Sequence, residues 1–166
     1  NIYITILRKH DELFGISGML KLQIERLKQK NVHICILETL TRNQAETIYQ
    51  TIKQEKISGA IYIKDADGYF KSEIVVQNGV AVCPIEKLPV LNPQHKSYVK
   101  VDNLFYITNI IEKRVISHLI NAGGYCFEDA TLFCEYYERV SKTNEKLYLS
   151  HIVYSMLLDK IDFRPT

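Results

Sequence analysis

The chain has 166 residues, of which 46% are hydrophobic and 24% are charged, the balance of an ordinary globular protein. The formal net charge is +2 and the charges are interspersed, which excludes an acidic tail and gives no support for a nucleic-acid-binding surface. No apolar run approaches the roughly 18 residues of a membrane span. The chain begins at Asn1 inside a strand-like run, which we interpret as the start of a fragment or a trimmed domain.

Apolar strand-like runs alternate with amphipathic helical segments in the first half of the chain. Strands are predicted over 2–7, 32–38, 57–64 and 80–86, and helices over 16–30 and 41–55, the second capped by Thr41. Residues 8–13 are polar and predict a loop, and residues 69–78 predict a short helix or loop. Strands that are apolar throughout indicate a sheet covered on both faces. We therefore predict an α/β fold with a doubly wound, mostly parallel sheet, which binds ligands at the carboxyl ends of its strands.

The pattern changes in the second half of the chain. Residues 98–102 alternate like a short fifth strand, and a long helix is predicted from Asp102 or Asn103 to about Asn121, ended by Gly123-Gly124. Residues 129–160 are mostly compatible with helix. This pattern predicts an α/β lobe over 1–127 and a helical extension, or the remnant of a second lobe, over 128–166.

The cysteines and histidines give little support for a metal site. The four cysteines contain no CxxC pair, and no two histidines lie three or four residues apart. Free, buried thiols in a cytoplasmic protein are the better interpretation of the cysteines. We accordingly expect neither a metal nor a cofactor.

Known catalytic motifs are also missing. Neither a GxGxxG phosphate loop nor a GxSxG nucleophile turn occurs in the sequence. Asp11-Glu12 after the first strand and Lys64-Asp65 after the third partly mimic the acidic pattern of a receiver domain, although the spacing differs. No catalytic constellation emerges, so we predict that the chain is not an enzyme.

Four segments in order resemble the amino-terminal subdomain of the lac-repressor/gal-repressor sensor, a periplasmic-binding-protein-like fold. The resemblance covers residues 1–124 and includes the spacing between the segments. The segments are FGISGMLKLQIERLKQKNVHICIL, QTIKQEKISGAIYI, NGVAVCPIEKLPV and VKVDNLFYITNIIEKRVISHLINAGG.

The resemblance implies a bacterial transcription regulator whose sensor binds a small polar effector, such as a sugar or sugar phosphate, and forms a homodimer. DNA would be bound only by a separate amino-terminal helix-turn-helix that this chain does not contain. Glu86-Lys87 stand where the family commonly has Asp-Arg, which keeps the charge signs and loses the planar fork of arginine. The effector-binding residues implied are Arg8, His10, Asp11, Phe14, Lys64, Asp65, Glu86, Lys87 and Asp102.

Two alternatives remain beside the sensor. The first is a receiver- or flavodoxin-like signalling domain or a small enzyme, with Asp11, Glu12 and Asp65 around Mg²⁺ and Lys87 nearby. The second is an interaction domain whose tail over 129–160 binds a partner.

Overall fold

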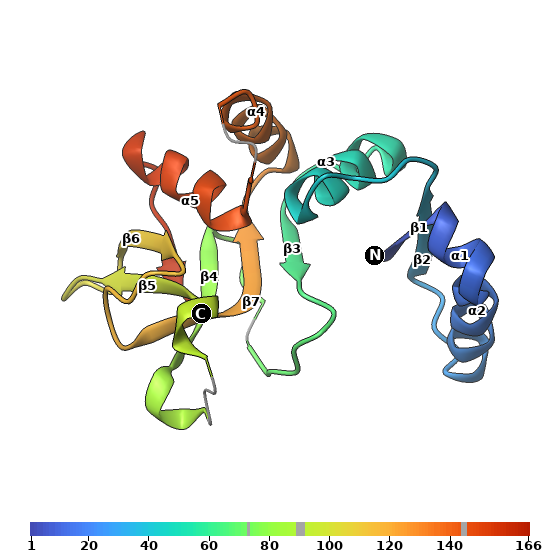
Figure 1. The fold of residues 1–166 in the computed structure, drawn as a ribbon, viewed down its shortest axis with the longest axis horizontal. Helices are drawn as coiled ribbons and strands as arrows, with labels where there is room; N and C mark the ends of the chain where they lie inside the picture. The colour runs from blue at the N-terminus through green and yellow to red at the C-terminus, as the bar shows by residue number, and fades with distance from the viewer. Residues whose placement is uncertain (73, 89–91, 144–145) are drawn as a thin grey trace. The chain divides into compact units, whose positions relative to one another are not determined.

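The computed structural model describes residues 1–72, 74–88, 92–143 and 146–166, which form two compact units. The first unit is Asn1–Ile57 and the second is Ser58–Thr166 (Figure 1). The structure thus divides near residue 57. Residue 73 of the predicted segment 69–78, residues 89–91, and residues 144–145 of the predicted helical segment 129–160 lie outside the described residues.

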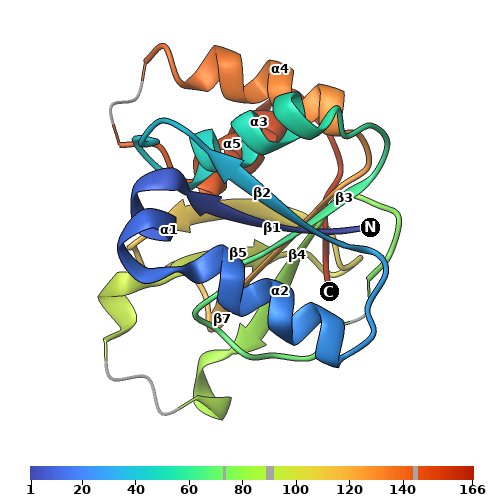
Figure 2. The ribbon, with the colours of Figure 1, turned by 90° about the vertical axis from the view of Figure 1, so that its right-hand side faces the viewer.

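The first unit is built on two parallel strands. β1 (Ile2–Leu7) pairs with β2 (Val32–Leu37), and both are rich in the β-branched residues that favour strands. Helices α1 (Arg8–Phe14) and α2 (Ile16–Arg26) lie on one side of the pair, and α3 (Gln44–Glu55) lies on the other (Figure 2). This arrangement confirms the predicted strand–helix alternation in this part of the chain.

The polar segment 8–13 is a helix, and the prediction of a loop there is wrong. α1 ends at Gly15, whose φ of +62° is the left-handed conformation that glycine adopts without strain. The Asp11 carboxylate then accepts a 2.6 Å hydrogen bond from the backbone N–H of Ser17 at the start of α2. Polar residues fit here because the helix is short and mostly exposed.

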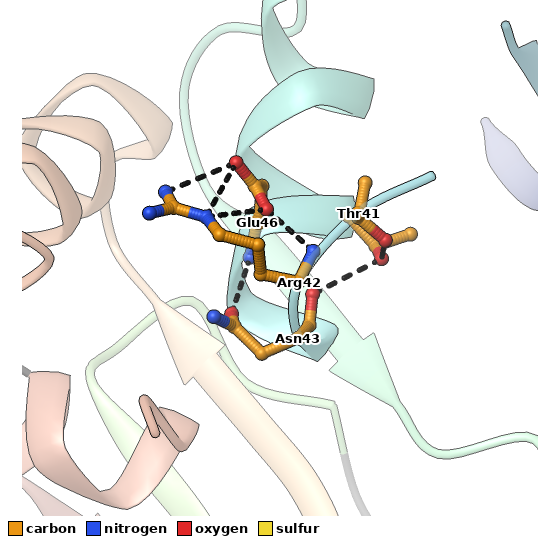
Figure 3. Close-up of polar contacts among 5 residues, drawn as sticks. Thr41, Arg42, Asn43 and Glu46 are labelled. Carbon is orange, nitrogen blue, oxygen red and sulfur yellow. Dashed lines mark hydrogen bonds and ion pairs between the residues drawn. The ribbon is translucent and has the colours of Figure 1, made fainter. Parts of the chain in front are cut away.

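Polar side chains hold the start of α3 (Figure 3). The Asn43 side chain accepts a 3.0 Å hydrogen bond from the backbone N–H of Glu46, so Asn43 is the cap. Thr41, the cap predicted from the sequence, instead shares a 2.7 Å hydrogen bond with the hydroxyl of Thr47. The Glu46 carboxylate accepts a 2.6 Å bond from the backbone N–H of Arg42, which closes the turn.

The second unit contains a six-stranded sheet around β7 (Leu119–Phe127). Antiparallel pairing joins β3, β4 and β5 to β7 and joins β5 to β6, whereas β4 and β8 pair in parallel. The predicted α/β class is therefore confirmed, with parallel pairing limited to β1–β2 and β4–β8 within the described residues. The remaining strands are β3 (Ile61–Lys64), β4 (Gly79–Pro84), β5 (Ser97–Val101), β6 (Ile107–Glu112) and β8 (Arg164–Pro165).

The long helix predicted from residue 103 to residue 121 is wrong, because β6 and the start of β7 occupy that segment. Asp102 begins a tight turn between β5 and β6, where its carboxylate accepts 2.9 Å bonds from the N–H groups of Leu104 and Tyr106. The segment contains five isoleucines and one valine, β-branched residues that favour strands even where their spacing matches a helix.

Two helices form in the segment that the sequence predicted as helical. α4 (Ala130–Val140) and α5 (Leu149–Leu158) pack against each other, and α5 covers β6. The rings of Phe133 and Phe163 meet that of Phe127 edge to face, with centroids 5.0 and 5.9 Å apart, in the fully buried core. Two short 3₁₀ helices, η1 (Ile85–Lys87) and η2 (Pro93–His95), follow β4. None of the helices in the described ranges combines the length and the apolar character that crossing a membrane requires.

Candidate functional site

The middle of β7 departs from regular pairing at residues 122–124. Val80 of β4 lies opposite Tyr125, and Val82 lies opposite Asn121, so three residues of β7 face the single residue Ala81. The Asn121 side chain accepts a 2.8 Å bond from the N–H of Gly123, whose φ is +93°. Such bulges re-aim side chains and occur often beside active sites.

The end of β3 lies against this bulge. The backbone N–H of Asp65 donates a 2.8 Å bond to the carbonyl of Gly123, and Lys64 lies opposite Gly124 in the strand register. A Cβ atom at position 123 would stand 2.8 Å from the Asp65 Oδ2 atom. The bare backbone of Gly123 therefore lets the Asp65 carboxylate approach the bulge closely.

Gly124 permits a second close approach. A Cβ atom there would stand 2.6 Å from the Tyr62 hydroxyl and 2.8 Å from both Ala81 and the ring of Phe70. The Lys64 ammonium lies 5.1 Å from the centre of the Phe70 ring and donates to the carbonyls of Asp65 and Gly68. The turn after β3, which also carries the exposed Asp67, is thus closed by Lys64 and fixed on the bulge.

The buried side chain of Tyr125 is affected by the charges of two acidic residues, Asp65 and Glu112. Burial raises the pKa of the Tyr125 hydroxyl, and the negative charges of Asp65 and Glu112 raise it further. Hydrogen bonding to the side chains of Asn121 and Ser97 acts in the opposite direction. The hydroxyl therefore stays protonated under the influence of Asp65, which follows β3, and Glu112, which ends β6.

Glu112 and its neighbour Lys113 are both held by hydroxyl groups. The Glu112 Oε2 atom accepts hydrogen bonds from the hydroxyls of Ser97, at 2.5 Å, and Ser150, at 2.9 Å. The Lys113 ammonium donates a 2.8 Å bond to the Tyr148 hydroxyl and lies 4.8 Å from the centre of the Tyr148 ring. The hydroxyl raises the pKa of Lys113, so the ammonium is held as a cation beside Glu112.

We call this set the β7 cluster. It holds carboxylates, a fixed ammonium and hydroxyl donors, a combination suited to a ligand with phosphate and hydroxyl groups. Its members are Lys64, Asp65, Ser97, Glu112, Lys113, Asn121, Tyr125, Tyr148 and Ser150.

Only Lys64 and Asp65 of the sequence-predicted site residues lie in the β7 cluster. Glu86 and Lys87 lie exposed in η1, after β4, and Asp102 is engaged in the β5–β6 turn. The other cluster members were missed because most of them lie in segments predicted as helix. Polar residues interrupting runs of isoleucine, as Glu112 does after Ile110 and Ile111, are the signal that could have found them.

The remaining predicted residues lie on α1 in the first unit. Arg8 forms an ion pair with Glu38, with Nη2 and Oε1 2.7 Å apart, and this raises the pKa of Arg8 and lowers that of Glu38. The hydrogen bond from Ser17 holds the pKa of the Asp11 carboxyl below its usual value. His10 and Phe14 are exposed. Arg8 and Asp11 thus both make contacts within the first unit. The described residues hold no group of three His, Cys, Asp or Glu side chains arranged to bind a metal ion.

No protein-family model and no curated protein matches the sequence. Solved structures do resemble it. A nucleoside-diphosphate-sugar pyrophosphorylase from Vibrio cholerae RC9 superposes with a TM-score of 0.78 at 18% identity, covering 98% of this chain and 70% of that one. An inositol-1-phosphate CTP transferase from T. maritima gives 0.71 at 14% identity, covering 97% and 63%. A UDP-glucose pyrophosphorylase complexed with UDP-glucose gives 0.66 at 12% identity, covering 99% and 73%.

These matches show that the chain shares the fold of these three enzymes, and it spans 63 to 73% of their length. The predicted lac-repressor-type sensor is therefore wrong, and so is the expectation of a non-enzymatic chain, since the matching proteins are enzymes. The resemblance failed because one of its four segments required a helix where β6 and β7 lie. DNA binding and a homodimer have no support. The matches are compatible with the predicted sugar-type ligand. Among the earlier hypotheses, the small-enzyme alternative agrees with the matches better than the sensor does.

Proposed function

We propose that this protein transfers a nucleotidyl group to a sugar phosphate. One observation carries the proposal: in a fold shared with these enzymes over nearly the whole chain, the β7 cluster contains two carboxylates whose charges act on Tyr125 and a fixed lysine beside one of them. In this reaction a phosphate oxygen of the sugar phosphate attacks the α-phosphorus of a nucleoside triphosphate. A new P–O bond forms, the bond to the β-phosphate oxygen breaks, and pyrophosphate leaves.

The phosphate groups of such substrates require positive charge around them. Asp65 is the residue that we propose to hold Mg²⁺, because its carboxylate is fixed against the bulge by Gly123. Mg²⁺ commonly takes one or two carboxylates and fills its remaining positions with water and substrate phosphates. A site without three protein ligands therefore fits this ion, with exposed Asp67 as the second available carboxylate. The ion would neutralise charge on the phosphates.

Glu112 and Lys113 of the β7 cluster fit the sugar phosphate. The Lys113 ammonium supplies a cation for its phosphate, and Glu112 supplies an acceptor for a sugar hydroxyl. A carboxylate has about four lone-pair sites, and the two serine hydroxyls occupy only part of them. Lys64 completes the proposed site by closing the turn that carries Asp65.

We further propose a cytoplasmic location. The four cysteines, Cys35, Cys83, Cys126 and Cys134, are free thiols, and three of them are buried. Burial raises the pKa of the Cys35 thiol to about 11 and also raises that of Cys126. Thiols of this kind suit a reducing compartment.

The proposal is tested by incubating the protein with Mg²⁺, each common nucleoside triphosphate and a panel of sugar 1-phosphates. Pyrophosphate release is followed with a coupled assay, and the nucleotide sugar is identified by mass spectrometry. The proposal is supported if pyrophosphate and a nucleotide sugar form in equal amounts for at least one pair of nucleoside triphosphate and sugar 1-phosphate. Absence of product from every pair, together with no nucleotide-dependent rise in melting temperature, would contradict it.

A further inference from the structure

Side chains at the start of α5 contact two adjacent charged residues, Glu112 at the end of β6 and Lys113 directly after it. α5 lies over β6 (Figure 1), and Ser150, only 1% exposed, donates a hydrogen bond to the Glu112 carboxylate. Two residues earlier, the Tyr148 hydroxyl accepts a hydrogen bond from Lys113, and the Tyr148 ring lies under the same ammonium. One short segment therefore reaches both charged groups.

The conformation of Lys113 is unusual for a surface lysine. Its φ is +58°, in the left-handed region that residues other than glycine seldom adopt. Its backbone N–H donates a 3.0 Å bond to the carbonyl of Lys96, while its side chain is held by Tyr148. An exposed lysine normally samples many rotamers, and fixing one of them costs conformational entropy. Lys113 is thus ordered before any ligand arrives.

Glu112 is oriented in the same way. Ser150 and Ser97 both donate to Oε2, and within the described ranges no side chain donates to Oε1. Two donors on one oxygen fix the rotation of the carboxylate. They leave the other oxygen available to a hydroxyl of a ligand.

We propose that Tyr148 and Ser150 are positioning residues for the sugar phosphate: Tyr148 aims the Lys113 ammonium at its phosphate, and Ser150 aims the Glu112 Oε1 atom at a sugar hydroxyl. This inference rests on the proposed function, because it takes the ligand class from it. Neither residue touches the reacting atoms. Because they hold Glu112 and Lys113 in place beforehand, less side-chain conformational entropy is lost when the ligand binds.

The test compares Tyr148→Phe with Tyr154→Phe. Phenylalanine at position 148 keeps the ring under Lys113 and removes the hydroxyl, whereas Tyr154 is an exposed tyrosine on the same helix. The side chain of Lys113 is followed by ¹⁵N NMR of its ammonium group and by its rate of labelling with an amine reagent. We expect Tyr148→Phe to lower the pKa of Lys113, speed its labelling and raise KM for the sugar 1-phosphate about fivefold, with kcat nearly unchanged. Tyr154→Phe should match the wild type.

Ser150→Ala supplies a second test if Tyr148→Phe unfolds. It should raise KM for the sugar 1-phosphate about fivefold, and Ser150→Thr, which restores a hydroxyl, should recover part of that loss. An active protein whose KM is unchanged in both Tyr148→Phe and Ser150→Ala would overturn the positioning roles and leave the proposed function standing.

If the wild type forms no nucleotide sugar, the proposed function fails, and direct binding of the sugar 1-phosphates decides the inference. A shift of the Lys113 ammonium signal on adding one of them, weakened by Tyr148→Phe, would support positioning. No shift with any of them would overturn positioning as well.

Discussion

The Asp65 carboxylate lies so close to the backbone of Gly123 that a Cβ atom at position 123 would stand 2.8 Å from Oδ2 and 3.1 Å from the Asp65 Cβ atom. Real Cβ atoms do not approach neighbours at the shorter of these distances, so any other residue at position 123 must displace Asp65. The φ of +93° at Gly123 adds a second reason for glycine. The position of the proposed magnesium-holding carboxylate therefore depends on a residue that carries no functional group.

Gly123→Ala should lower kcat/KM for nucleotide-sugar formation by roughly tenfold or more, because small displacements of a catalytic group have large kinetic effects. The matched control is Gly59→Ala, since Gly59 has a φ of +76° but would bring its Cβ atom within 4 Å of nothing. Each variant should lose about 1–2 kcal/mol of stability from the left-handed backbone. Equal activity of the two variants in a steady-state assay would show that the contact with Asp65 has no functional role.

The environment of His151 makes stability depend on pH. Burial lowers the pKa of His151, while the negative charge of Glu112 opposes that shift, and the backbone N–H of Tyr148 donates a 3.4 Å bond to Nδ1. The folded state therefore favours neutral imidazole, and the unfolded state binds more protons below about pH 6.5. The free energy of unfolding should fall as the pH drops below that value and level off once the pH is below the folded pKa.

Urea denaturation at a series of pH values measures this dependence. His151→Gln, which cannot be protonated, should flatten the curve in this range, whereas the exposed His118→Gln should not. The lowered pKa values of Asp11 and Asp159 act in a separate, more acidic window, because their stabilisation is lost as the pH falls through the folded pKa, below about 3.9. A curve for His151→Gln that coincides with the wild type would refute the assignment.

Loss of the Asn43 cap should destabilise α3. Asn43→Ala removes the acceptor for the N–H of Glu46 and should cost about 1 kcal/mol, whereas Asn43→Asp keeps an acceptor and should cost little. Thermal denaturation followed by circular dichroism at 222 nm measures both variants. If alanine and aspartate melt at the same temperature, the side-chain cap contributes nothing to stability.

The elements predicted correctly are those in which local sequence and packing agree. Residues 2–7 and 32–37 are short runs rich in β-branched residues and followed by a charged residue, and they form β1 and β2 in parallel as expected. Lys64 and Asp65 were placed correctly at the end of a strand, because a polar pair follows the buried run that ends at Ile63.

The segment 103–121 shows why the rest of the site escaped prediction. Ile107, Ile110 and Ile111 have spacing that fits a helix, while their branched side chains fit a strand, and pairing with β5 decides between the two. Gly123-Gly124 was interpreted as a helix stop, although the pair forms a bulge inside β7. A bulge depends on contacts with β3 and β4, which are distant in sequence, so local pattern alone does not reveal it.

The most direct test of the β7 cluster as a nucleotidyl-transfer site is pyrophosphate release by Asp65→Asn compared with Asp162→Asn, a matched change at an exposed aspartate outside the cluster. Asparagine keeps the size of the Asp65 side chain and removes the charge that Mg²⁺ requires, so kcat should fall by about a hundredfold or more at saturating Mg²⁺. Asp162→Asn should keep the wild-type rate, and both variants should keep the wild-type melting temperature within a few degrees. An Asp65→Asn protein that releases pyrophosphate at the wild-type rate would contradict the account.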